Sequence, residues 1–339
     1  MTAFDETPPA LPLSALEDLA RRAFGVEGKA RPLASERDQN ARIVAGSAEY
    51  VLKIANAAED PAQIALQNAT MAHLARAGVA GLPRLIPTLA GADCADVDAG
   101  GKTCLVRMVS WVAGHPLSQA PRSTAQLASL GAFMGRLTRG LQGFGHPAAF
   151  RPDFPWSLDH VGNLRGHVAD IADPARRALV AGLFARHEAR VLPALPGLRA
   201  SVLHQDANDN NVIVDTAEPA RIAGLIDFGD MCFGRTVNEL AITLAYALLD
   251  APDLYAALRT IIAAYVAEFP LHEPEADILY DLMRMRLAAS VCISSRQARK
   301  HPENDYLLIS QGPAFALLER LDRIDPEFMV ALCRRAAGF

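Results

Sequence analysis

Apolar and polar residues alternate in short runs over the first third of the chain, a pattern typical of half-buried β-strands. A helix is predicted ahead of these runs, over residues 13–24, where apolar residues recur at helical spacing and Gly25 supplies a stop. A second helix, beginning at Pro61, interrupts the strands. The pattern therefore predicts an N-terminal extension over residues 1–24 and a β-rich lobe over residues 25–112. In that lobe, strands are expected at residues 42–45, 50–54, 85–89 and 103–112, with a hairpin loop at residues 93–102.

The pattern becomes helical from residue 113 to the C-terminus. Ser123 is expected to cap a long helix that ends at Leu141. Together the two regions predict an α+β fold with a small β-rich N-terminal lobe and a large helical C-terminal lobe, residues 113–339. The other elements expected in the second lobe are a helix over residues 179–191 and short strands over residues 211–214 and 222–226.

Two clusters of polar residues, each directly after a short apolar run, stand out in the C-terminal region. The first contains His204, Asp206 and Asn211, and the second begins at Asp227. Phosphoryl transfer needs a group that positions or deprotonates the attacking hydroxyl, and a divalent metal that neutralises the phosphates. Asp206 can accept the hydroxyl proton, while Asn211 and Asp227 offer oxygen ligands that suit Mg²⁺. The clusters therefore predict a kinase site in which Asp206 is catalytic, Asn211 and Asp227 hold metal, and His204 holds the turn.

The pattern H-x-D-x-x-x-x-N at residues 204–211, followed by D-F-G at residues 227–229, resembles a known signature. Protein kinases and kinases of the aminoglycoside phosphotransferase (APH) superfamily share it as their catalytic loop and metal loop. The resemblance implies a protein-kinase-like two-lobe fold, with nucleotide bound by the N-terminal lobe and catalysis and substrate binding in the C-terminal lobe. A polar loop with a chance match is the competing interpretation, against which the order and short spacing of the two motifs argue.

A kinase of this fold needs a strand lysine upstream, and Lys53 stands alone among apolar residues in the run from Tyr50 to Ile54. We expect Lys53 to contact the nucleotide phosphates. Taken alone, it would be interpreted as a lysine on an exposed edge strand. The helix that begins at Pro61 carries Gln67 where this fold usually has a glutamate, so a neutral amide is expected to orient Lys53.

The sequence has no G-x-G-x-x-G motif ahead of Lys53, which argues against a protein kinase more than against a small-molecule kinase. Residues 33–40 are expected to form the loop between the first strands. In this loop Ser35, Gln39 and Asn40 can donate hydrogen bonds to phosphates; a solvated polar loop is the alternative.

Residues 108–111 follow the last strand of the first lobe and are expected to act as a hinge that gives the nucleotide base its backbone hydrogen bonds. Met108 and Ser110 are the candidate contacts. The few residues between Met231 and Thr236 leave no room for the activation segment of a protein kinase. These features predict a small-molecule kinase that uses ATP or GTP.

Further stretches resemble the hydroxylysine-kinase branch of the APH superfamily. They are SERDQN at residues 35–40, EYVLKIAN at residues 49–56, Gln67-Asn68, and DFGDM at residues 227–231. The resemblance implies a small amine-bearing acceptor, with a hydroxylysine-like amino alcohol favoured. Gln205 stands where most members have glycine, and its role is open at this point.

Several residues are candidates for the acceptor site. Asp209 and Asp230 could bind a substrate ammonium, although each could equally cap a turn. Arg286 could bind a substrate carboxylate, or it could extend its charged end to solvent from an apolar helix. Trp156 could form a wall of the pocket or anchor the core, and Glu239 is expected to serve as the negative charge at a helix N-terminus.

The composition limits the classes of partner that are expected and suggests where the protein is located. The formal net charge is −5 and the chain has no basic block, so nucleic acid is not an expected partner. The five cysteines form no C-x-x-C pair, which favours reduced thiols in the cytoplasm. No secretion signal is evident, and no apolar run approaches the roughly 20 residues of a membrane span. We expect a cytoplasmic monomer or homodimer without a membrane partner.

The sequence thus predicts transfer of the γ-phosphoryl group of ATP or GTP, with Mg²⁺, to a hydroxyl of a hydroxylysine-like amino alcohol. Aminoglycosides, choline, ethanolamine and homoserine are the alternative acceptors. A non-catalytic nucleotide-binding pseudokinase is the alternative of another class. The intact set of Lys53, Asp206, Asn211 and Asp227 argues against that alternative.

Overall fold

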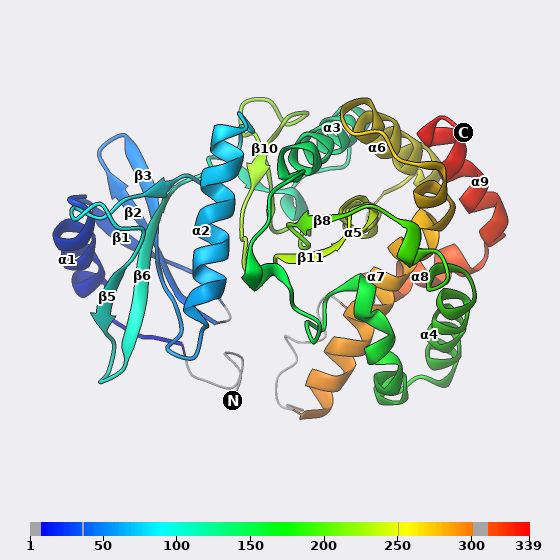
Figure 1. Cartoon of the computed structure of the whole chain (residues 1–339), viewed down its shortest axis with the longest axis horizontal. Helices are drawn as coiled ribbons and strands as arrows, with labels where there is room; N and C mark the ends of the chain where they lie inside the picture. Colours follow the sequence, from blue (N-terminus) through cyan, green and yellow to red (C-terminus); the bar gives the residue numbers. More distant parts are fainter. Residues whose placement is uncertain (1–7, 36, 250, 301–310) are drawn as a thin grey trace. The chain divides into compact units, whose positions relative to one another are not determined.

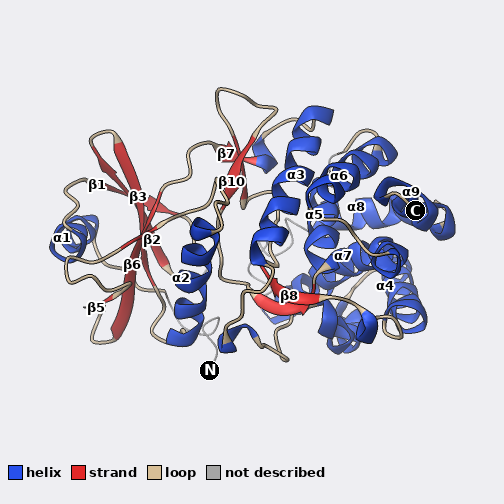
Figure 2. Ribbon diagram, turned by 45° about the horizontal axis from the view of Figure 1, so that its top comes forward, coloured by secondary structure: helices blue, strands red, loops and turns tan. Residues whose placement is uncertain are grey.

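The computed structural model describes residues 8–35, 37–249, 251–300 and 311–339 (Figure 1). The first seven residues of the predicted N-terminal extension lie outside this description. The chain forms two compact units, Met1–Ala113 and Gly114–Phe339, and each is described by itself. Strands dominate the first unit and helices dominate the second (Figure 2), as expected for the predicted α+β fold.

The first unit is built on an antiparallel sheet with the strand order β1-β2-β3-β6-β4, and β5 also pairs with β6. The tight turn between β2 and β3 places Gly46 at a φ of +62°, a conformation that glycine adopts without strain. The strands are β1 (Lys29–Leu33), β2 (Gln39–Ala45), β3 (Ala48–Ile54), β4 (Leu85–Ile86), β5 (Ala95–Asp98) and β6 (Thr103–Ser110).

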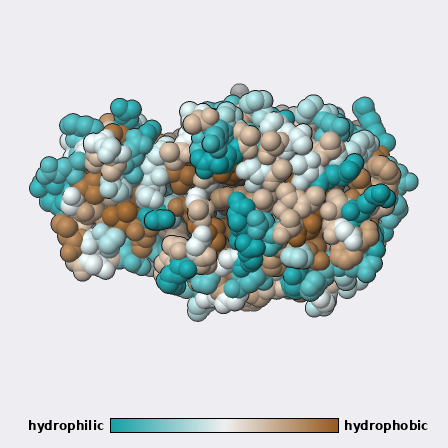
Figure 3. Space-filling view, turned by 90° about the horizontal axis from the view of Figure 1, so that it is seen from above, coloured by the Kyte–Doolittle hydropathy of each residue, from teal (hydrophilic) through white to brown (hydrophobic). Residues whose placement is uncertain are grey.

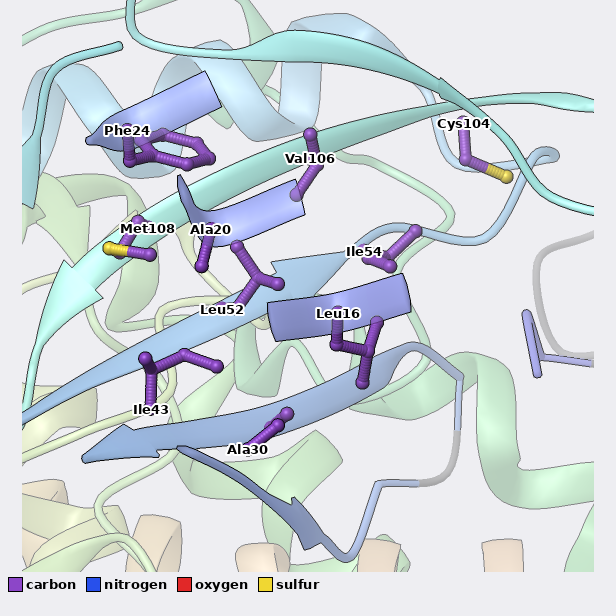
Figure 4. Close-up of a cluster of buried hydrophobic side chains, with 11 residues drawn as sticks. Leu16, Ala20, Phe24, Ala30, Ile43, Leu52, Ile54, Cys104, Val106 and Met108 are labelled. Atoms are coloured by element: carbon purple, nitrogen blue, oxygen red, sulfur yellow. The ribbon is translucent and has the colours of Figure 1, made fainter. Parts of the chain in front are cut away.

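Helices cover both faces of this sheet (Figure 1). On one face lies α1 (Leu13–Phe24), which ends at Gly25 with a φ of +69°, the predicted stop. Its buried side chains pack on those of β2, β3 and β6 in the core cluster shown in Figure 4. On the other face lies α2 (Pro61–Arg76), whose first turn is capped by the side chain of Asp60. The alternation of side chains along each strand therefore separates an apolar face under α1 from a face directed at α2.

The second unit is mainly helical, with two small sheets. Its helices are α3 (Thr124–Leu141), α4 (Pro174–Arg186), α5 (Val237–Ala247), α6 (Leu254–Glu268), α7 (Glu273–Lys300), α8 (Gln311–Asp322) and α9 (Pro326–Ala337), with a 3-10 segment, η3, over Leu158–Asp170. One small sheet joins β7 (His115–Pro116), β9 (Val212–Val214) and β10 (Ile222–Leu225), and the other pairs β8 (Ala200–Leu203) with β11 (Cys232–Arg235).

Two glycines let α3 pack closely on α6. A Cβ atom on Gly131 would lie 2.3 Å from the main-chain oxygen of Ile261, and one on Gly135 would lie 2.6 Å from that of Tyr265. Larger residues at these positions would push the helices apart. The start of α3 is as predicted, because the side chain of Ser123 accepts the N–H of Gln126.

Some expected boundaries were wrong. The predicted hairpin loop at residues 93–102 contains the strand β5, and the strand expected at residues 85–89 ends at Ile86. Gln39 and Asn40 lie in β2 rather than in a loop. The helix expected over residues 179–191 begins five residues earlier, because Asp173 caps it ahead of a proline at its first position.

Hydrophilic and hydrophobic side chains are interspersed over the face presented in Figure 3. Within the described ranges, no helix is both long and apolar enough to cross a membrane.

Candidate active site

The loop after β8 carries the predicted site residues Asp206 and Asn211, and it begins with the buried His204, which is expected to hold the turn. Its Nε2 donates to the main-chain oxygen of Ile226 at 3.1 Å, and its ring meets the ring of Phe228 edge-on, with centroids 4.8 Å apart. Burial lowers the pKa of His204 to about 4, so the ring is neutral near pH 7. Its Nδ1 then accepts the N–H of Asp206 at 3.3 Å. The ring therefore joins the catalytic loop to the D-F-G segment.

The next residue, Gln205, has a φ of +71°, in the left-handed region that favours glycine. Its N–H and that of His204 donate to the two carboxylate oxygens of Glu239, at 3.3 and 2.6 Å. Glu239 lies in the first turn of α5, as expected, and is fully buried, which raises its pKa to about 7. Glu239 thus fixes the backbone of the catalytic loop, a role that the sequence did not indicate.

The carboxylate of Asp206 is held from two sides. The Nη2 of Arg286 lies 3.1 Å from its Oδ1. The amide nitrogens of Asn208 and Asn211 lie 2.9 and 2.7 Å from its Oδ2. Burial raises the pKa of Asp206, while the positive charge of Arg286 lowers it. The plane of the carboxylate is therefore fixed by α7 on one side and by the loop itself on the other.

Two further residues of the loop shape it. The Oδ1 of Asn208 accepts the N–H of Asn211 at 3.1 Å, which closes the turn. The carboxylate of Asp209 lies 3.5 Å from a guanidinium nitrogen of the buried Arg122. This ion pair favours an anchoring role for Asp209, and its binding of a substrate ammonium stays a prediction.

The D-F-G segment follows β10 and begins at Asp227, which has a φ of +60°. The Oδ1 of Asp227 accepts the N–H of Gly229 at 3.1 Å. Arg151 donates to the main-chain oxygens of Gly229 and Met231 at 3.2 and 3.0 Å, and its guanidinium lies 3.8 Å from the ring centroid of Phe154. Arg151 therefore holds this segment in place from outside the motif.

The donors of the two motifs fit a magnesium ion that also binds phosphates. The amide nitrogen of Asn211 is engaged by the main-chain oxygen and the carboxylate of Asp206, at 3.0 and 2.7 Å, which turns its amide oxygen toward other partners. No group of three or more His, Cys, Asp or Glu side chains suited to a metal occurs among the residues that the structure describes. One amide and one carboxylate are typical of Mg²⁺, which keeps waters and borrows phosphate oxygens.

Arg286 and Trp156, both candidates for the acceptor site, contact each other. The guanidinium of Arg286 lies 4.6 Å from the ring centroid of Trp156, and its Nη1 donates to the main-chain oxygen of Trp156 at 3.3 Å. Its Nε donates to the hydroxyl of Tyr246 at 3.2 Å. The half-buried Asp230 contributes its charge to the same cluster. The structure therefore brings these candidates together with Asp206, and their contact with an acceptor stays a prediction.

In the first unit, Lys53 lies in a polar row that crosses three strands. It pairs with Asn40 on β2 and with Arg107 on β6. Leu52 and Ile54, its neighbours in β3, point into the core under α1, so Lys53 points to the opposite face. The Oδ1 of Asn40 is buried and has no hydrogen-bond partner among the described residues. Phosphate binding by Lys53 and Asn40 stays a prediction.

Gln67 on α2 contacts Arg107. Its Oε1 accepts a hydrogen bond from Arg107, and the Oδ1 of Asn68 accepts another from the same guanidinium at 2.8 Å. These two amides attach α2 to β6. Orientation of Lys53 by Gln67 stays a prediction.

The remaining candidates for nucleotide binding have partners within the first unit. The side-chain amide of Gln39 exchanges two hydrogen bonds with the main chain of Leu11, at 2.8 and 2.7 Å. The Oγ of Ser35 accepts the N–H of Asp38 at 3.2 Å. The first contact attaches the segment before α1, and the second stabilises a turn. Contacts of Ser35 and Gln39 with phosphates stay predictions.

Met108 and Ser110 were expected in a hinge after the last strand, but both lie within β6. The side chain of Met108 is buried in the core, and its backbone is flanked by Leu52 of β3 and Ile86 of β4. The N–H of Ser110 donates to the main-chain oxygen of Arg84 at 2.8 Å. Contacts of Met108 and Ser110 with a nucleotide base stay predictions.

Comparison with known proteins assigns the chain to a family. A model of the phosphotransferase enzyme family (APH) matches residues 29–276. The chain belongs to this family. It is therefore a small-molecule kinase, which transfers a phosphoryl group to a hydroxyl, and the resemblance noted in its two motifs is confirmed.

The curated relatives match this kinase over different lengths. Hydroxylysine kinase of Danio rerio is 31% identical over 331 residues, 93% of this chain and 93% of that protein. Homoserine kinase of Pseudomonas aeruginosa (strain UCBPP-PA14) is 35% identical over only 135 residues, 39% of this chain and 40% of that protein.

Solved structures confirm the fold. A microcompartment-associated aminopropanol kinase matches with a TM-score of 0.70 at 18% identity, over 91% of this chain and 97% of that chain. An amicoumacin kinase in complex with AMP-PNP, Ca²⁺ and amicoumacin matches with a TM-score of 0.70 at 14% identity, over 94% and 97%.

Sequence reasoning missed four residues that position this kinase's candidate groups: Arg107, Arg122, Arg151 and Asn208. Asn208 lies inside the motif and could have been found from its turn-forming character. The three arginines act across long sequence distances, and a buried arginine has no local signature.

Proposed function

We propose that this kinase phosphorylates the hydroxyl of a small amine-bearing metabolite and that hydroxylysine is the first acceptor to test. The observation that carries the proposal is the carboxylate of Asp206, which three side-chain donors hold while 18% of the side chain stays exposed. The acceptor class is supported by two relatives whose names specify amino alcohols, the hydroxylysine kinase of Danio rerio and the aminopropanol kinase. Homoserine remains a second candidate on a shorter match.

In the proposed reaction, Asp206 binds and orients the acceptor hydroxyl and takes its proton as the hydroxyl oxygen attacks the γ-phosphorus. The bond from the γ-phosphorus to the oxygen that bridges it to the β-phosphorus breaks, and a nucleoside diphosphate leaves. Arg286, Asn208 and Asn211 keep the carboxylate oriented during this step. Since His204 is neutral and donates to a carbonyl, it takes no part in the proton transfer.

ATP or GTP is the proposed phosphoryl donor, with Mg²⁺ as its metal. Asn211 and Asp227 would hold the ion, which when bound neutralises charge on the phosphates. Lys53 is proposed to bind the phosphates, with Asn40, Ser35 and Gln39 as further candidates. Gln67 is proposed to orient Lys53, and Met108 and Ser110 to contact the base.

Four residues are proposed for the acceptor site. Asp230 and Asp209 would attract an ammonium group, and Trp156 would supply an apolar wall. Arg286 is the residue that the sequence offers for a substrate carboxylate, but its guanidinium is engaged by Asp206. A cytoplasmic location is also proposed, because the five cysteines are free thiols and four of them are buried. A monomer or a homodimer is the proposed assembly.

The direct test is a coupled nucleotide-turnover assay with ATP and GTP in parallel. The acceptors are hydroxylysine, 1-amino-2-propanol, ethanolamine, choline, homoserine and an aminoglycoside. We expect hydroxylysine to give the highest kcat/KM and Asp206→Asn to abolish that turnover while nucleotide binding persists. A higher kcat/KM for homoserine or an aminoglycoside would replace the proposed acceptor, and normal turnover by Asp206→Asn would refute the role of Asp206.

A further inference from the structure

Arg286 is the largest of the fully buried side chains among the residues that the structure describes. It lies on α7, with a residue exposure of 1%, and its neighbours in sequence are apolar. A charged group in such a position needs hydrogen-bond partners for its donors. Each of its three nitrogens has one: the hydroxyl of Tyr246, the main-chain oxygen of Trp156 and the carboxylate of Asp206.

The relative exposure of the two ionic partners indicates which of them can reach an acceptor. The side chain of Arg286 is 2% exposed and that of Asp206 is 18% exposed. A substrate can therefore approach the carboxylate, while the guanidinium lies behind it. The ring of Trp156 covers one face of the guanidinium, with 4.6 Å between the guanidinium carbon and the ring centroid.

The contact with Trp156 also connects Arg286 to the backbone of the catalytic loop. The main-chain oxygen of Trp156 accepts from Arg286 at 3.3 Å and from the Nε2 of Gln205 at 2.8 Å. Gln205 directly precedes Asp206 and is fully buried. The segment before η3 is thus attached to the loop beside Asp206 and to the arginine that holds its carboxylate.

We propose that Arg286 is a positioning residue that orients the Asp206 carboxylate for the acceptor hydroxyl, and that it does not bind the acceptor's own carboxylate. This rests on the proposed function, in which Asp206 receives the hydroxyl. The guanidinium fixes Oδ1 while the two asparagine amides fix Oδ2, so loss of the guanidinium frees the carboxylate to rotate about its Cβ–Cγ bond. A rotated carboxylate no longer lines up with the acceptor hydroxyl, which lowers the rate of the chemical step without weakening substrate binding.

The test compares two acceptors that differ only in a carboxylate: hydroxylysine and its decarboxylated analogue, 1,5-diaminopentan-2-ol. With Arg286→Gln, we expect kcat to fall by about 10- to 100-fold for both acceptors, and KM for each to change by less than about threefold. Guanidinium chloride at low millimolar concentration should partly restore kcat of Arg286→Ala. A KM increase of about tenfold or more for hydroxylysine alone would overturn the proposal and make Arg286 the carboxylate ligand.

Arg284 supplies the matched control on the same helix. It is 6% exposed, but its ion pair is with Asp322, at 3.6 Å, and within the described ranges no hydrogen bond or ion pair joins it to Asp206. Arg284→Gln should lower Tm while kcat stays within about twofold of the wild type. An equal fall of kcat in Arg284→Gln and Arg286→Gln would show a general loss of folding and overturn the positioning role.

A milder variant covers the case in which Arg286→Gln does not fold. Tyr246→Phe removes only the oxygen that accepts from the Nε of Arg286, and we expect a fall in kcat of about two- to fivefold with unchanged KM. Unchanged kcat in this variant would count against the proposal. The slow hydrolysis of nucleotide by water, measured in the same samples, tests the positioning role of Arg286 separately from the identity of the acceptor. Should the wild type use neither acceptor, the proposed function fails, whereas the role of Arg286 is still decided by the hydrolysis rates.

Discussion

Gln67 of α2 accepts a hydrogen bond from Arg107 of β6, and Arg107 lies directly across the strand pair from Lys53. Kinases of this fold usually pair a glutamate of the helix with the strand lysine. In this chain the helix amide of Gln67 instead binds Arg107, a cation on the neighbouring strand. Asn68 contributes a parallel hydrogen bond to the same guanidinium at 2.8 Å. The attachment of α2 to the sheet therefore depends on Arg107.

Replacing Arg107 with leucine should destabilise the protein by roughly 2–4 kcal/mol. The substitution leaves the acceptor oxygens of Gln67 and Asn68 buried without this donor. Urea denaturation of the variant and the wild type measures the difference in the free energy of unfolding. Arg31→Leu, at an exposed position of β1, is the control and should change that energy by less than about 0.5 kcal/mol. Equal effects of the two substitutions would contradict this account of Arg107.

Glu239 should make stability depend on pH. Its pKa is about 7 in the folded protein against an ordinary value of 4.5, so the folded state holds the proton more tightly. Its contribution to the free energy of unfolding should therefore fall as pH rises from about 4.5 to about 7, and stay constant above that. The stability difference between wild type and Glu239→Gln should decrease by roughly 2 kcal/mol from pH 5.5 to pH 8.

Glu239 interacts electrostatically with several neighbouring groups. They include Asp206 and Arg286, and Glu239 in turn acts on Cys232 and Tyr265. Burial raises the pKa of Cys232 to about 12 and also raises that of Tyr265, so neither changes charge between pH 5.5 and 8. Repeating the comparison in an Asp206→Asn background removes the carboxylate whose negative charge also raises the pKa of Glu239. A pH-independent difference in that background would refute the prediction.

At position 205, a glycine substitution should destabilise the protein less than an alanine substitution, which reverses the usual order. At a φ of +71°, a side chain costs about 1 kcal/mol or more that glycine does not. Gln205→Ala keeps this strain and loses the hydrogen bond to Trp156, whereas Gln205→Gly loses the hydrogen bond and relieves the strain. We expect the glycine variant to be the more stable by about 1 kcal/mol in thermal or urea unfolding. A more stable alanine variant would show that the backbone relaxes at this position.

Substitutions of Asp227 and Asp206 should have different effects: the first should weaken metal-dependent nucleotide binding, and the second should abolish turnover alone. Asp227→Asn removes the only carboxylate proposed as a metal ligand, so the nucleotide Kd with Mg²⁺ should rise by about tenfold or more. Asp206→Asn should leave that Kd within about threefold. Calorimetric titration of each variant with a non-hydrolysable nucleotide, with Mg²⁺ and with EDTA, measures both effects. Equal Kd values for the two variants in Mg²⁺ would remove Asp227 from the metal site.

The sequence indicated the candidate active site because its chemistry lies in two short motifs with fixed spacing. His204, Asp206 and Asn211 come from one loop, and local hydrogen bonds hold them together. The start of α3 and the end of α1 were also predicted, because their caps are local: Ser123 accepts the N–H of Gln126, and Gly25 ends α1 in the left-handed conformation.

The partners of these groups could not be predicted, because they depend on the tertiary fold. Arg286 reaches Asp206 across 80 positions of sequence and Arg107 reaches Gln67 across 40. The strand β5 was mistaken for a loop because its alanine and its two aspartates have low strand propensity, and pairing with β6 overrides that preference. The open question of Gln205 is answered in part, since its left-handed backbone explains why glycine suits this position and its amide contacts Trp156.

The carbonyl oxygen of Trp156 is shared by two side chains, those of Gln205 and Arg286. A main-chain oxygen is present whatever residue occupies position 156, so no substitution there can delete the acceptor. Residues 205 and 286 are therefore coupled. When one of the two side chains is lost, the other becomes the sole side-chain donor to this oxygen and its hydrogen bond is expected to strengthen. Double-mutant effects at these two sites should be non-additive, and during evolution a change at one site alters which changes the other can accept.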